Sequence, residues 1–208
     1  MKLTHLAGIA GLALAGCTSA PTQYYTLLPT VQEAPAPRSA GPLPFQFELA
    51  SVQVPVQVDQ PQLVVRQQQG VLAILENQRW GSPLADEFHD ALADQLERQL
   101  GVRDLAGLPK APGVPIVSVQ NDVRRFDSLP GRYALIDVVW SLGLRGDSQQ
   151  RRQLTCSSQI SRPAGVELDS LVKAHQQAIA ELAQTIADTA RRWQQNPASQ
   201  CPPALTRG

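Results

Sequence analysis

The sequence predicts an α+β fold in which a mostly antiparallel sheet carries two main helices packed on one face. Apolar and polar residues alternate in the stretches 45–75 and 117–160, with the period of half-buried strands. In 83–100 and 169–195, apolar residues instead recur every three to four positions, as on an amphipathic helix. The expected order is therefore strands, a helix, three strands and a second helix, all within a single domain.

The first strands of this domain are expected between residues 45 and 75. Alternation runs over 45–54 but slips before Val52, which predicts a strand with a β-bulge. Two apolar segments, 63–65 and 71–75, flank the polar stretch 66–70, and this arrangement predicts a β-hairpin.

The first helix is expected over 83–100, because a single apolar stripe repeats at four-residue intervals there. The stripe consists of Leu84, Phe88, Leu92, Leu96 and Leu100. Ser82 is the expected N-cap, Pro83 suits the first helical position and Gly101 is the expected stop. The acidic residues of this helix, Glu87 among them, are expected on a solvated face.

Three further strands and a second helix complete the domain. Strands are expected over 117–123, over 134–144, where alternation is clearest, and around 154–160, and the short turns between them predict an antiparallel meander. A helix over 169–195 follows, and the proline-containing residues 196–208 form a flexible tail.

Composition excludes several classes of function. The formal net charge is +0 at pH 7, so the chain lacks the basic surface that nucleic-acid binding requires. There is also no polybasic segment for anionic lipid head groups.

The sequence also lacks a catalytic or metal-binding constellation. His89 and His175 lie far apart without Cys or carboxylate ligands at metal spacing, so we expect no metal and no cofactor. His89 is expected on the helix surface and His175 in or near the core. Ser82 is explained by its capping role, and no G-x-S-x-G elbow surrounds it. The protein is therefore not expected to be an enzyme.

The N-terminus has the pattern of a secretory signal over residues 1–16, with a charged start, an apolar run and small residues before Cys17. Leu14-Ala15-Gly16-Cys17 resembles the lipobox of bacterial lipoproteins, which implies cleavage before Cys17 and covalent acylation of its sulfur. The alternative is an ordinary secretory peptide with an incidental cysteine. In lipoproteins of the enterobacterial type, Thr18 in place of Asp after the cysteine resembles the outer-membrane sorting class.

Residues 17–42 are rich in proline and are expected to form a lipidated spacer between the membrane and a folded domain over 43–195. Within this spacer, residues 24–28 form an aromatic, β-favouring island that we expect to dock as a short edge strand.

Two cysteines remain beyond Cys17. An oxidising periplasm would permit Cys156 and Cys201 to form a disulfide that pins the C-terminal tail to a strand. The alternative is a buried thiol at Cys156 and a free thiol at Cys201.

Four features together resemble the ABC-type transport auxiliary lipoproteins, and most closely the PqiC family, over residues 14–195. They are Cys17, Tyr24-Tyr25-x-Leu27, Trp80-Gly81-Ser82-Pro83-Leu84 and Trp140-x-Leu142, of which the segment from Trp80 to Leu84 is the most specific. The resemblance implies a non-catalytic outer-membrane lipoprotein that docks a periplasm-spanning MCE-domain protein of the PqiB type in intermembrane lipid transport, supporting membrane integrity. An axial partner of this kind also suggests a homo-oligomeric ring.

Trp80, Tyr24 and Tyr25 are the candidate interface residues, because aromatic side chains dominate binding hot spots. Trp80 equally suits packing near the helix entry, and the two tyrosines equally suit pairing within their own sheet. The alternative function is an envelope lipoprotein scaffold or activator of another periplasmic machine, for cell-wall synthesis or outer-membrane assembly.

Overall fold

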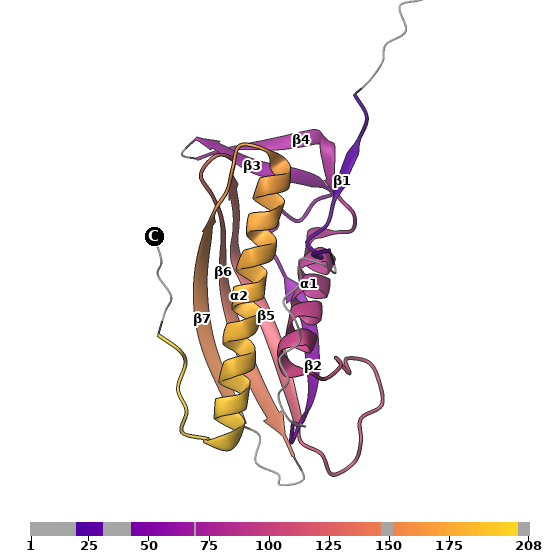
Figure 1. Cartoon of the computed structure of the whole chain (residues 1–208), viewed down its shortest axis with the longest axis vertical. Helices are drawn as coiled ribbons and strands as arrows, with labels where there is room; N and C mark the ends of the chain where they lie inside the picture. Colours follow the sequence, from indigo (N-terminus) through magenta and orange to yellow (C-terminus); the bar gives the residue numbers. More distant parts are fainter. Residues whose placement is uncertain (1–19, 31–42, 69, 147–151, 204–208) are drawn as a thin grey trace, which may run out of the picture.

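The structure is a computed structural model that describes residues 20–30, 43–68, 70–146 and 152–203. It consists of a three-stranded sheet, a four-stranded sheet and two helices in one domain (Figure 1). The predicted α+β class and the predicted order of elements are confirmed.

The larger sheet contains β2 (Gln46–Gln53), β5 (Ile116–Leu129), β6 (Tyr133–Arg145) and β7 (Arg152–Pro163), in the order β2-β5-β6-β7. Strands β5, β6 and β7 form the predicted antiparallel meander. The register shift in β2 before Val52 is the predicted bulge. Strand β2 pairs with β5 in parallel, because the long connection through a hairpin and a helix returns the chain in the same direction.

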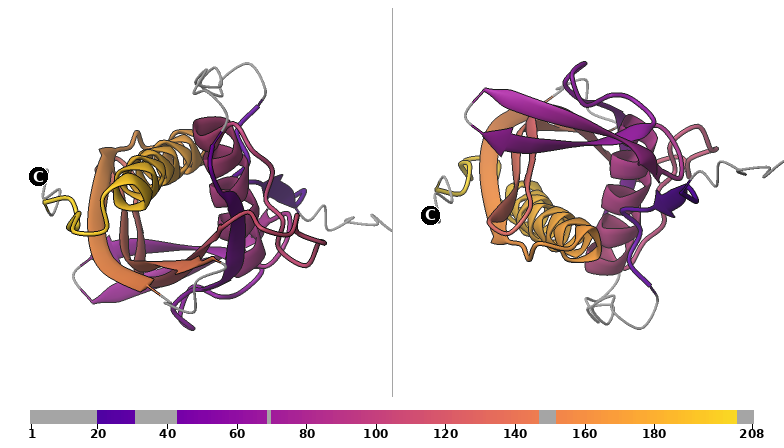
Figure 2. Two further views of the ribbon diagram at one scale, coloured as in Figure 1. Left: turned by 90° about the horizontal axis from the view of Figure 1, so that it is seen from below. Right: turned by 90° about the horizontal axis from the view of Figure 1, so that it is seen from above.

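Both helices cover one face of this sheet, as predicted. Helix α1 (Leu84–Leu100) and helix α2 (Leu168–Gln195) pack against each other and over the sheet, as the views along the long axis show (Figure 2). The inward residues of the alternating strands and the helix stripes form the main core. Trp140 lies near its centre and donates its indole N–H to the Ser158 hydroxyl at 3.0 Å.

The ends of α1 differ in part from the prediction. Pro83 occupies the N-cap position in an extended conformation, so the helix begins at Leu84 and Ser82 lies outside it. The Ser82 hydroxyl makes no cap hydrogen bond to a helical N–H and donates instead to the Glu87 carboxylate. At the other end Gly101 has φ 73°, the left-handed conformation that favours glycine, and ends the helix as predicted.

The predicted hairpin is present but belongs to a separate sheet. Strands β3 (Gln62–Gln68) and β4 (Val71–Trp80) pair in antiparallel, and β1 (Gln23–Tyr25) pairs in parallel with β4, in the order β1-β4-β3. This sheet crosses the end of the molecule at which α2 begins (Figures 1 and 2). Val65 packs there against Leu171 and Ala174 of α2.

The short edge strand changes the predicted organisation of the N-terminal segment. Because β1 lies within the fold, the domain includes residues 23–28 as well as the expected 43–195. The expected signal segment 1–16, the expected lipidation site Cys17 and the proline-rich residues 31–42 lie outside the described residues.

Candidate functional site

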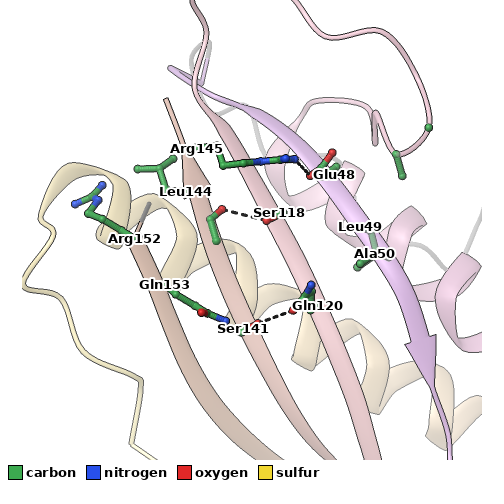
Figure 3. A pocket seen from close by; sticks show the side chains of 13 residues that line it. Glu48, Leu49, Ala50, Ser118, Gln120, Ser141, Leu144, Arg145, Arg152 and Gln153 are labelled. Carbon is green, nitrogen blue, oxygen red and sulfur yellow. Dashed lines mark hydrogen bonds and ion pairs between the residues drawn. The ribbon is translucent and has the colours of Figure 1, made fainter. Parts of the chain in front are cut away.

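A polar trough lies on the face of the four-stranded sheet that the helices leave open (Figure 3). Two adjoining hollows of about 500 Å³ and 440 Å³ share Ala50, Gln120, Ser141 and Gln153. These residues come from all four strands, β2, β5, β6 and β7, because outward side chains alternate with core side chains along each strand. The trough therefore displays mainly small or neutral side chains.

Hydrogen bonds between neighbouring strands organise the floor of the trough. The Ser118 hydroxyl donates to the Gly143 carbonyl at 3.3 Å, and the Ser141 hydroxyl lies 3.5 Å from the Gln120 amide oxygen (Figure 3). A Cβ atom at Gly143 would lie 2.7 Å from the Ser118 hydroxyl oxygen, so a side chain there would displace this hydroxyl. The floor displays uncharged hydrogen-bonding side chains such as Ser118, Gln120 and Ser141, which suit a polar partner.

Charged residues close one rim of the trough. Glu48 on β2 accepts from Arg145 at 2.5 Å, and its other oxygen lies 2.9 Å from the Lys110 ammonium. Partial burial alone would raise the pKa of Glu48, but hydrogen bonds and charge from Lys110 and Arg145 lower it below its ordinary value. Glu48 therefore stays ionised at neutral pH and holds the loop between α1 and β5 against the sheet.

A buried carboxylate, Glu87, joins the N-terminal strand to the start of α1. One oxygen accepts from the Thr26 hydroxyl at 2.7 Å and the Leu27 backbone N–H at 2.8 Å. The other accepts from the Ser82 N–H at 3.0 Å and the Ser82 hydroxyl at 3.1 Å. The prediction that Glu87 lies on a solvated face is wrong, because these four donors replace the water that a buried carboxylate loses.

Gly81 lies in close contact with this carboxylate and with β1. A Cβ atom at Gly81 would lie 3.1 Å from a Glu87 oxygen and 3.5 Å from the Tyr25 carbonyl oxygen, to which the Gly81 N–H donates at 2.8 Å. The residue pattern from Trp80 to Leu84 is therefore explained by structure, because this segment connects β4 to α1 and contacts β1.

Trp80 belongs to a buried aromatic cluster, so the interpretation of this residue as an interface anchor is wrong for the described chain. It is 5% exposed and packs edge-on against Phe126 of β5 at 6.1 Å between ring centroids. Phe88 of α1 contacts the same ring at 6.5 Å. The alternative interpretation, packing near the helix entry, describes its position.

His175 of α2 completes this cluster. Its ring stacks on Phe126 at 3.9 Å, and its Nε2 atom lies 2.9 Å from the Ser128 hydroxyl. Complete burial lowers the pKa of His175 to about 3, although the nearby Asp127 charge opposes the shift. The imidazole is therefore neutral at pH 7 and serves packing, as expected from its place on the helix.

This buried histidine makes stability depend on pH. The unfolded chain takes up a proton below its ordinary pKa near 6.5, whereas the folded chain does not, so stability falls as the pH falls through that value. We expect His175 to contribute a loss of about 2–3 kcal/mol in the free energy of unfolding between pH 7 and pH 4.5. Denaturant unfolding of His175→Gln at both pH values should lack this loss, and His89→Gln, at a partly exposed histidine, should retain it. Equal pH dependence in the wild type and His175→Gln would contradict the assignment.

Tyr24 and Tyr25 lie on opposite faces of β1. Tyr25 packs partly against the core, and burial followed by the nearby Asp169 and Glu167 charges raises the pKa of its phenol. Tyr24 is 68% exposed and remains a candidate interface residue.

The structure joins Cys156 of β7 to Cys201 of the tail by a disulfide, with Cα atoms 5.5 Å apart. The tail is therefore held beside the outer edge of the sheet, where its path follows β7 (Figure 1).

No group of three or more His, Cys, Asp or Glu side chains within the described ranges is placed to hold a metal ion. Neither helix that the structure describes is long and apolar enough to cross a membrane. The buried role of Glu87 and the trough were not identified from the sequence. The position of Glu87 beside the apolar stripe of α1 was the one feature that could have indicated its burial.

A family model and two solved structures match this chain. The family model described as "ABC-type transport auxiliary lipoprotein component" matches residues 25–187. A crystal structure of a Xanthomonas campestris protein has a TM-score of 0.61 at 20% identity, covering 85% of this chain and 99% of that one. A crystal structure of an uncharacterized protein has a TM-score of 0.57 at 20% identity, covering 81% and 98%. These two structures show the same fold.

A putative lipoprotein from Caulobacter crescentus is more distant, with a TM-score of 0.34 at 12% identity over 54% of this chain and 83% of that one. No curated protein matches the chain. The family model, which spans most of the described fold from β1 into α2, determines the assignment. The chain belongs to the family of ABC-type transport auxiliary lipoprotein components.

Proposed function

We propose that this protein is a non-catalytic outer-membrane lipoprotein subunit of an MCE-type, Pqi-like intermembrane lipid transport system. In this role it is anchored through acylated Cys17 and docks a periplasm-spanning MCE-domain protein of the PqiB type. The observation that carries the proposal is the family match over residues 25–187, since that family serves ABC-type transport systems. Anchoring through several acyl chains would be stable, because each buried methylene contributes about 0.8 kcal/mol.

The polar trough is the surface that best suits the docking of such a partner. It offers hydrogen-bonding side chains such as Gln120 and Gln153 over two adjoining hollows, which suit a polar partner. It lies where β7 begins, whereas β1 lies at the end where α2 begins (Figure 1). A partner in the trough would therefore be separated from the anchored end of the chain.

Affinity purification of the full lipidated chain tests the proposal. We expect an MCE-domain protein to co-purify after mild cross-linking, and we expect the double variant Gln120→Arg, Gln153→Arg to reduce its recovery at least about tenfold by filling the trough with charge. Gln177→Arg with Gln184→Arg is the matched control, because these two glutamines are also exposed but lie on α2.

Recovery of a periplasmic synthase domain in place of an MCE-domain protein would contradict the proposed system and favour a scaffold of another envelope machine. Recovery of the MCE-domain protein at equal yield with both double variants would remove the trough from the docking surface.

A further inference from the structure

Exposed apolar side chains are concentrated at one end of the molecule. The described residues include nine large hydrophobic side chains that are exposed. Six of them belong to elements at the end where α2 begins, and we call these six the apolar end surface: Tyr24, Val56, Val71, Leu72, Ile74 and Val166. Of the other three, Leu108 and Val114 lie in the loop between α1 and β5, and Leu28 follows β1.

The topology brings these six residues to the same end. Strand β2 runs parallel to β5, so the loop after β2, with Val56, lies at the end where β5 turns into β6. Val166 precedes α2 and approaches that turn, since a Cβ atom at Gly131 would lie 3.6 Å from its Cγ1 atom. The β3–β4 hairpin, which carries Val71, Leu72 and Ile74, crosses this end, and β1 enters the fold beside it (Figure 1).

The chain toward Cys17 leaves from this end. Positions 17 and 23 are six residues apart, and an extended chain spans at most about 3.6 Å per residue, so Cys17 lies within about 22 Å of Gln23. The distance between Cys17 and the body is short because β1 and Leu27 are part of the fold, where they are held by the pairing with β4 and by the Glu87 carboxylate. Helix α2 has 28 residues and a length of about 42 Å, so the opposite end of the molecule lies much farther from the anchor.

We infer that the apolar end surface lies in the interface of the lipid bilayer that holds Cys17, so that the long axis of the molecule points away from the membrane. The inference rests on the proposed lipidation of Cys17. Aromatic and aliphatic side chains such as Tyr24 and Ile74 gain free energy at the boundary between head groups and acyl chains. The short connection keeps this surface near the bilayer and makes contact between them effectively intramolecular.

Charge does not explain the contact. Arg124 pairs with Asp122 and Arg125 pairs with Asp127, and Glu76 and Glu167 also lie on elements of this end, so acidic side chains accompany the basic ones. We therefore expect the contact with zwitterionic lipids as well as anionic ones, and little dependence on salt.

Depth-dependent fluorescence quenching on the full lipidated chain tests the orientation. Ile74→Cys and Leu108→Cys form a matched pair, because Ile74 is 50% exposed and Leu108 is 55% exposed at opposite ends. Each variant carries a thiol-reactive fluorophore and is reconstituted into phosphatidylcholine vesicles that contain a lipid with a nitroxide near the head group. The parent chain, labelled in parallel without reductant, corrects for other thiols.

We expect quenching at position 74 to exceed quenching at position 108 by at least about threefold, with Val166→Cys behaving like Ile74→Cys. Vesicle flotation distinguishes loss of the lipid anchor from a wrong orientation of the domain. Chains that float but show equal quenching at 74 and 108 overturn the orientation and leave the lipid anchor intact. Chains that do not float overturn the anchor and the orientation together. Cross-linking between copies through position 74 without lipid quenching would assign the apolar end surface to self-association and overturn its contact with lipid.

Discussion

Glu87→Ala is expected to lower the free energy of unfolding by about 4 kcal/mol. The substitution leaves the buried N–H group of Leu27 without an acceptor, together with the partly buried N–H of Ser82 and the partly buried hydroxyls of Thr26 and Ser82. Each buried donor without a partner costs about 1–3 kcal/mol, and the cavity adds to the loss. Denaturant unfolding of the mature chain measures the effect.

The same variant should release β1. Hydrogen exchange at the Leu27 and Gly81 amides, which are held by Glu87 and by the Tyr25 carbonyl, is expected to accelerate more than exchange in the core strand β6. Glu76→Ala, which removes an exposed carboxylate from β4, is the matched control and should change stability by less than about 0.5 kcal/mol. A Glu87→Ala protein as stable as Glu76→Ala would contradict the role of Glu87.

Cys201→Ala is expected to lower the free energy of unfolding by about 3 kcal/mol. The disulfide joins residues 45 positions apart, so it removes conformational freedom from a long loop of the unfolded chain. Cys201 is the better position for substitution, because Cys156 is buried and its replacement would also leave a cavity.

Reductant provides the control for this prediction. In a Cys17→Ala background, reduction should destabilise the parent to the level of Cys201→Ala and leave that variant unchanged. If reductant has no effect on the parent, and mass spectrometry after alkylation finds two free thiols, then Cys156 and Cys201 do not pair in the protein.

Local patterns predicted most of the fold. The apolar stripe from Leu84 to Leu100, with its four-residue spacing, predicted α1, and alternation over 134–144 predicted β6. When one face of a helix or strand is buried, apolar residues recur with the period of that element. Gly101 predicted the end of α1, because helices commonly end at a residue in the left-handed conformation and glycine adopts it readily.

Contacts between distant residues were not predictable in the same way. Glu87 appears in the sequence as one acidic residue beside Asp86, and its partners Thr26 and Leu27 lie about sixty positions away. The parallel pairing of β2 with β5 and the separation of β1, β3 and β4 into a second sheet likewise depend on tertiary packing. The burial of Trp80 could not be distinguished from an interface role until Phe126 and Phe88 were placed beside it.

The packing of β1 also changes the proposed geometry at the membrane. The proline-rich residues 31–42 follow β1 and precede β2, so they do not separate Cys17 from the body. If Cys17 is acylated as proposed, the connection to the anchor is the segment between Cys17 and Gln23, which would hold the domain close to the bilayer.

Acylation of Cys17 is the step on which the proposed function and orientation both depend. Mass spectrometry and fractionation of cells that express the chain or Cys17→Ala measure it most directly. We predict that the wild-type chain begins at Cys17, carries covalent acyl chains and sediments with the outer membrane, whereas Cys17→Ala retains its leader or is recovered without lipid. A wild-type chain with an unmodified Cys17, or a Cys17→Ala chain of the same mature size that still sediments with the membrane, would contradict this account.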